Sequence, residues 1–128
     1  MNRFLNIFKI VFHLLNVLLI FFYLFPGSVL GWFFYNNLSK QPKLTNDFFN
    51  ISSNHFYTFV IFSFFGILSY SKHKKFNLLI SYLLLLSVVL ELLHLFIPQR
   101  SFQFEDLFGN ILGVVFVLLI YKIWRIKL

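Results

Sequence analysis

The sequence contains no cysteine and no alanine, and only four of its 128 residues are acidic. The absence of cysteine excludes disulfide bonds, thiolate nucleophiles and metal or iron–sulfur sites built on thiolates. Charged residues make up 12% of the chain, about half of the roughly 25% that is usual in a soluble domain. With so few charges the chain cannot cover itself with a surface that suits water. A soluble globular protein is therefore excluded.

Apolar residues dominate what is present: they form 59% of the chain, and 21 of them are phenylalanine. A membrane-spanning helix needs about 20 such residues. Four apolar stretches of helical length occupy approximately residues 8–25, 55–70, 76–97 and 107–123, and a short aromatic segment at 29–35 follows the first. None of them alternates strictly, which excludes barrel strands. The sequence predicts an all-α integral membrane bundle of four transmembrane helices, formed as a single domain over residues 1–128.

The basic residues are divided unevenly between the ends of these stretches. Three of them, Lys40, Lys43 and Arg100, fall in the first and third connecting loops. The other eight fall near the termini and in the second loop: Arg3, Lys9, Lys72, Lys74, Lys75, Lys122, Arg125 and Lys127. The positive-inside rule then predicts that both termini are cytoplasmic. The alanine-free usage, rich in Phe, Asn, Lys, Ile and Leu, is typical of an AT-rich bacterial genome, so we expect the inner (cytoplasmic) membrane. Lysines in these places contact lipid headgroups, so we expect membrane lipids and no nucleic acid as partners.

One acidic residue lies inside a predicted membrane helix. Glu91 is 15 residues beyond Phe76, where the third apolar stretch begins. At 1.5 Å per residue this places Glu91 about 22 Å into a hydrocarbon core of about 30 Å. A carboxylate at such a depth costs roughly 2.5–3.5 kcal/mol, so it usually faces a bundle interior. We therefore expect Glu91 to face other helices and to serve a function.

Polar residues on three predicted helices lie at about the depth of Glu91. On the third helix they follow the spacing i, i+4, i+7, which places them on one face, and the fourth helix repeats this spacing. The second helix begins with a histidine at the same level. These residues are Ser87, Glu91 and His94, then Asp106, Asn110 and Gly113, and finally His55. The pattern predicts a polar site just beneath the outer face of the membrane.

Residues 91–113 carry a spaced motif. They resemble the VanZ-like signature E-x-x-Q-x-x-x-P-x-R followed by D-x-x-x-N-x-x-G, with matches at Glu91, Pro98, Arg100, Asp106, Asn110 and Gly113. The chain has His94 in place of the family's Gln, and it matches the family's second motif, D-K-x-x-H-F, only at His55 and Phe56. The resemblance covers about residues 50–120. It implies a small multi-helix protein of the bacterial envelope, in a family whose founding member contributes to teicoplanin resistance.

The predicted site suits an anionic amphiphile, such as a lipid-linked cell-wall precursor. Arg100 would bind the anionic group, because its planar guanidinium matches phosphate and carboxylate. Glu91 and Asp106 would orient polar groups of the ligand, and Asn110 would hold the third and fourth helices in register. The predicted ligand-binding residues are His55, Glu91, His94, Arg100, Asp106 and Asn110. Gly109 and Gly113 form a G-x-x-x-G motif and are predicted to allow close helix packing.

Two other functions use the same residues. In a membrane enzyme, Glu91 or His94 would act as general base and Arg100 would stabilise charge on a transferred phosphoryl or acyl group. In a structural subunit bound to a membrane protein partner, Arg100 would instead neutralise Glu91 or Asp106. The spacing Glu91-x-x-His94 also occurs on metal-binding helices, and His55 or Asp106 could complete such a shell. The family's Gln at the second position is a poor ligand, so we expect no metal and no cofactor.

Overall fold

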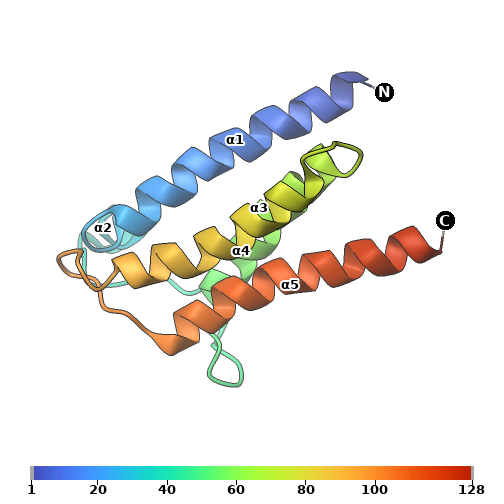
Figure 1. Ribbon diagram of the computed structural model, residues 1–128. Helices are drawn as coiled ribbons and strands as arrows, with labels where there is room; N and C mark the ends of the chain where they lie inside the picture. Colours follow the sequence, from blue (N-terminus) through green and yellow to red (C-terminus); the bar gives the residue numbers. More distant parts are fainter. Residues whose placement is uncertain (1, 128) are drawn as a thin grey trace.

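Five α-helices form the structure of this chain, a computed structural model that describes residues 2–127 (Figure 1). Four long helices run along one another as an elongated bundle, and one short helix lies at an end of it. In chain order they are α1 (Asn2–Leu24), α2 (Val29–Tyr35), α3 (Ser53–Tyr70), α4 (Phe76–Leu93) and α5 (Phe104–Ile126). The predicted all-α class is confirmed, since no strand is assigned among these residues.

The prediction of four membrane-spanning helices is wrong by one. Helix α1 over Arg3–Leu24, α4 and α5 are long and apolar enough to cross a membrane, and α3 is not. Helix α3 has 18 residues, enough for about 27 Å, but polar residues such as Ser53, Asn54 and His55 lower its hydropathy. It also lies in contact with α1, α4 and α5. The polar residues at its start, such as Ser53 and His55, are buried against these neighbours, while Ile61 and Phe64 are about half exposed.

The helix boundaries at one end of the bundle follow from local chemistry. Helix α1 ends before Pro26, whose ring cannot continue a helix, and Gly27 then turns the chain with a φ of +87°. The side chain of Ser28 caps α2 by accepting from the Gly31 amide at 2.9 Å. Helix α4 ends at Leu93, four residues before the predicted end, because the next amides bond to carbonyls three residues back and tighten the last turn.

The two ends of the bundle differ in what they hold. The start of α1, the end of α5 and the turn between α3 and α4 lie at one end (Figure 1). Helix α2, residues 36–52 and residues 94–103 lie at the other, which we call the site end. Both chain termini therefore belong to the same end of the bundle. The face of the membrane toward which that end points stays a prediction.

Helix α5 packs against α3 with almost no space between their backbones. A Cβ atom added at Gly109 would lie 2.7 Å from the carbonyl oxygen of Ser52, and one added at Gly113 would lie 2.7 Å from that of Phe56. Such distances are below any real Cβ contact, so only glycine fits at these two points. The close contact brings the first turns of α3 and α5 together at the site end.

Candidate functional site

Five of the predicted ligand-binding residues meet at the site end. His55 lies in the first turn of α3, and Glu91 lies in the last turn of α4. His94 is the first residue after α4, and Asp106 and Asn110 lie near the start of α5. The Nε2 atom of His55 lies 3.6 Å from Oδ2 of Asp106, and Nδ1 of His94 lies 3.1 Å from Oε2 of Glu91. The side chain of Glu91 is completely buried, and that of His94 nearly so. Two histidines and two carboxylates thus form one cluster, in which His55, Glu91 and His94 are buried and Asp106 is partly exposed.

Asn110 joins this cluster to three other helices. Its Nδ2 donates to the carbonyl oxygen of Ser87 at 3.1 Å. Its Oδ1 accepts from the Tyr23 hydroxyl at 2.7 Å and lies 3.1 Å from Nδ1 of His55. Because the Ser87 carbonyl can only accept, the amide nitrogen must face it, and this fixes the orientation of the amide. The fully buried Asn110 therefore connects α5 to α1, α3 and α4.

Tyr23 had no predicted role, and the structure places it in the centre of the cluster. Its ring stacks on His94 at a centroid distance of 5.6 Å, and its hydroxyl lies 3.1 Å from Nδ1 of His55. Tyr23 is the single tyrosine of α1 and lies in its last turn. The sequence could have indicated this role, because Tyr23 places a hydroxyl near the end of the first apolar stretch, at the same level as the other polar residues.

Glu91 ties the turn after α4 to the cluster. Its Oε1 accepts from the backbone amide of Gln103 at 3.0 Å, which holds the chain just before α5. Its Oε2 has no hydrogen-bond partner, although Nδ1 of His94 is near. His94 itself donates from Nε2 to the carbonyl oxygen of Tyr23 at 3.0 Å. Glu91 and His94 thus each use one polar atom in a hydrogen bond to the backbone, and the other polar atom of each faces the other residue.

Arg100 does not pair with a carboxylate among the residues that the structure describes. Its Nε donates to the carbonyl oxygen of Phe25 at 3.1 Å, and its Nη2 donates to that of Phe22 at 2.7 Å. These carbonyls end α1, so Arg100 caps that helix and meets the negative end of its dipole. The pairing with Glu91 or Asp106 that a purely structural subunit requires is absent from the described residues.

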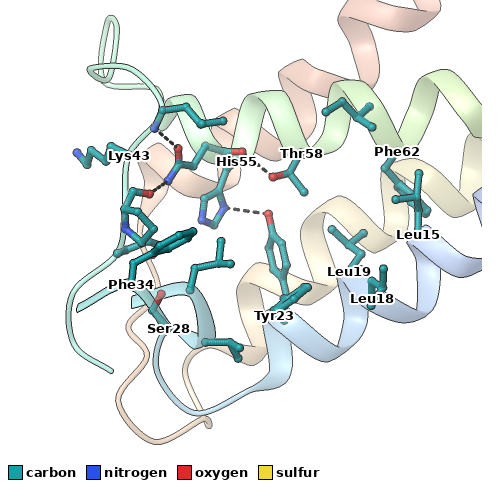
Figure 2. Close-up of a pocket in the computed structure, with 18 of the residues that line it drawn as sticks. Leu15, Leu18, Leu19, Tyr23, Ser28, Phe34, Lys43, His55, Thr58 and Phe62 are labelled. Carbon is teal, nitrogen blue, oxygen red and sulfur yellow. Dashed lines mark hydrogen bonds between the residues drawn. The ribbon is translucent and has the colours of Figure 1, made fainter. Parts of the chain in front are cut away.

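A large, mostly apolar cavity of about 470 Å³ opens beside the cluster, between α1, α2 and α3. Figure 2 shows that Leu15, Leu18, Leu19 and Phe62 line one end of it, while His55, Lys43 and Ser28 lie toward the other. Arg100 also lines this cavity. We call it the apolar cavity. It combines a long hydrophobic wall with two cationic side chains.

A second, polar cavity of about 180 Å³ lies next to the first. It is lined by His94 and Asp106 of the cluster, and it shares Arg100 and Ser28 with the apolar cavity. We call it the polar cavity. Arg100 therefore stands at the boundary between the two cavities. Glu91 and Asn110 line neither of them and support the site from behind.

The sequence of the chain was also compared with known proteins. The family model described as VanZ/LLP1 matches residues 3–125, which extends the resemblance from the central motif to almost the whole chain. No curated protein and no solved structure matches the chain. On this near-complete match, the chain belongs to the VanZ/LLP1 family of proteins.

Proposed function

We propose that this membrane protein binds an anionic amphiphile, such as a lipid-linked cell-wall precursor, at the site end of the bundle. The observation that carries this proposal is the apolar cavity, whose hydrophobic wall ends at Lys43 and Arg100. A hydrocarbon chain of the ligand would occupy the apolar part, and its anionic headgroup would lie at the two cations. Because the two cavities share Arg100 and Ser28, a larger headgroup would have space to extend into the polar cavity, toward His94 and Asp106.

The rim of the apolar cavity favours entry of a ligand from the membrane. Leu18 on α1 and Ile61 on α3 both line the cavity and are about half exposed. These exposed apolar side chains face lipid in a membrane, so a chain can pass between them without crossing water. Since lipid tails are as apolar as leucine, moving a chain from the bilayer into the cavity gains little free energy. Selectivity must therefore come from the headgroup.

Arg100 and Lys43 provide that headgroup recognition. A guanidinium has five N–H donors, and Arg100 uses two of its nitrogens on the α1 carbonyls, so donors remain for a phosphate or carboxylate. Lys43 forms an exposed ion pair with Asp47, and such pairs exchange readily for another anion. The proposal therefore assigns anion binding to a fixed guanidinium and a movable ammonium.

Native mass spectrometry of the detergent-extracted protein tests the headgroup part. We expect wild type to retain anionic lipids, and Lys43→Gln and Arg100→Gln to retain several-fold less. Lys40→Gln is the matched control, because Lys40 lies in the same loop but over the ring of Tyr35 and not in the cavity. If wild type and both cavity variants carry the same lipids in equal amounts, the headgroup assignment is wrong.

A second pair of variants tests the hydrophobic part. Leu18→Trp places a larger ring at the rim of the apolar cavity and should reduce lipid retention. Leu14→Trp makes the same change one turn earlier on α1, at an exposed residue outside the cavity, and should not reduce it. Equal retention by the two variants would contradict chain binding in this cavity.

The membrane-enzyme alternative is favoured by one observation, the place of His94 beside Arg100 in the polar cavity. There His94, rather than the enclosed Glu91, would act as general base. Incubation of the purified protein with lipid phosphates tests this function. Turnover that is lost in His94→Gln would support it, and turnover that persists in this variant would remove His94 from that role.

A further inference from the structure

Both histidines of the cluster have one ring nitrogen fixed by a protein acceptor. Nδ1 of His55 lies 3.1 Å from Oδ1 of Asn110, an amide oxygen that can only accept, so Nδ1 carries the proton. Nε2 of His94 lies 3.0 Å from the carbonyl oxygen of Tyr23, so there Nε2 carries the proton. The remaining nitrogens are Nε2 of His55 and Nδ1 of His94. In a neutral imidazole each of them presents a lone pair.

These two lone pairs face carboxylates. Nε2 of His55 is 3.6 Å from Oδ2 of Asp106, and Nδ1 of His94 is 3.1 Å from Oε2 of Glu91. A lone pair and a carboxylate oxygen repel each other unless a positive charge lies between them. Oε2 of Glu91 has no hydrogen-bond partner and its side chain is completely buried, so this charge is not supplied by solvent. Arg100 does not supply it either, because it forms no ion pair with Glu91 or Asp106 among the described residues.

We propose that His55, Glu91 and Asp106 bind a divalent transition metal ion. One potential ligand atom from each residue lies within 4.8 Å of the others. Metal–ligand bonds of about 2.1 Å place tetrahedral ligands about 3.4 Å apart, so the three side chains need to close by at most about 1.4 Å. They come from α3, α4 and α5, and the metal would join these helices at the site end. The ligand set is thus different from the Glu91-x-x-His94 pair that the sequence suggested.

The surroundings of the three ligands have the features of a metal site. A metal-bound histidine usually donates its other N–H to a fixed acceptor, which is what Asn110 provides for His55. The backbone amide of Gln103 donates to Oε1 of Glu91 and so fixes the orientation of this second ligand. Asp106 lines the polar cavity, which leaves room for water or a ligand at an open coordination position. His94 lies against Glu91, and the lone pair on its Nδ1 would complete the shell.

The chemistry of the donors selects the class of metal. Calcium takes six to eight oxygen ligands and magnesium keeps several waters, whereas one imidazole and two carboxylates suit zinc, iron(II) or manganese(II). Zinc is the probe of choice because it binds such sets without redox chemistry. The site is separate from the cations Lys43 and Arg100, so this inference does not rest on the proposed lipid binding.

The test uses the full-length protein in detergent, purified through a tag without histidines. The protein is treated with a chelator, incubated with zinc chloride and dialysed, and bound zinc is measured by elemental mass spectrometry and calorimetry. We expect one zinc per wild-type chain. Glu91→Gln and Asp106→Asn should each raise the Kd by at least about 100-fold, and Asn110→Leu by about 10–100-fold. Glu105→Gln is the matched control, since Glu105 is exposed beside Asp106, and it should bind as wild type does.

The outcomes show whether a metal ion or a proton supplies the positive charge between the histidines and the carboxylates. Wild type that retains no zinc, or a loss in Glu105→Gln equal to that in Asp106→Asn, overturns the proposal. Circular dichroism checks that the variants remain helical. Where a variant does not, X-ray absorption of zinc-loaded wild type decides: one or two imidazoles with oxygens at about 2.0–2.2 Å support the site, and a shell without histidine overturns it. No lipid is added, so lipid binding can fail while zinc binding holds.

Discussion

The contact between α3 and α5 makes a sharp prediction about Gly113→Ala. The added Cβ would lie 2.7 Å from the carbonyl oxygen of Phe56 and 3.0 Å from the amide nitrogen of Val60, both of them backbone atoms. Ordinary contacts begin at 3.4 Å. Backbone atoms inside a helix cannot turn aside, so α5 must move away from α3 by about 0.7 Å at this point.

The size of the effect follows from two opposing terms. Overpacking of this kind costs about 1–3 kcal/mol, and replacing glycine by alanine within a helix returns about 1 kcal/mol. We expect Gly113→Ala to lower the free energy of unfolding by about 1 kcal/mol. Gly66→Ala is the matched control, because its Cβ would meet the ring of Phe12 at 2.8 Å, and a side chain can give way. That variant should be within about 0.5 kcal/mol of wild type.

Unfolding by denaturant in detergent micelles, followed by circular dichroism, measures both variants. Zinc affinity gives a second readout, because His55 lies on α3 and Asp106 on α5, and their separation depends on this contact. Gly113→Ala should weaken zinc binding and Gly66→Ala should not. If Gly113→Ala is as stable as wild type while Gly66→Ala is the weaker protein, the backbone contact between α3 and α5 is not what sets their spacing.

Three further predictions concern the site end. Asn110→Leu removes three interhelical contacts, which at about 0.6 kcal/mol each should lower the free energy of unfolding by about 2 kcal/mol in the same denaturant assay. Arg100→Gln removes the cap of α1, and hydrogen exchange should be faster in the last turn of that helix than in its middle. The hydrogen bond from Lys43, with that from the Ser53 amide, holds the pKa of Asp47 below its usual value. This stabilisation is present above the unfolded-state pKa and is lost as the pH falls through the lower folded-state value, so melting temperatures between about pH 5 and 2.5 should fall less in Asp47→Asn than in wild type.

The convergence of the polar residues was predictable because depth in a membrane follows from position along a helix. Glu91 lies near the outer end of its predicted helix, Asp106 near the start of the next and His55 at the start of another, so all three had to lie at one level. The G-x-x-x-G motif likewise indicated a close contact. The motif alone did not identify α3 as the partner helix, since that depends on how the helices are arranged around one another.

The partner of Arg100 and the role of Tyr23 were not predictable in the same way. An arginine beside two acidic residues in sequence suggests an ion pair, but the path of residues 94–103 carries its guanidinium to the end of α1. That path depends on the early end of α4 at Leu93, which the apolar pattern through Ile97 concealed. Tyr23 contacts residues between 32 and 87 positions away. Contacts at such separations follow from the tertiary arrangement and not from local patterns.

The central position of α3 has a consequence for how the protein is made. This helix is less apolar than the helices long and apolar enough to cross a membrane, yet its most extensive contact is with α5, which is synthesised after it. Until α5 is made, α3 therefore lacks its most extensive contact. A chain cut short after α4 therefore leaves its least hydrophobic long helix without its main support.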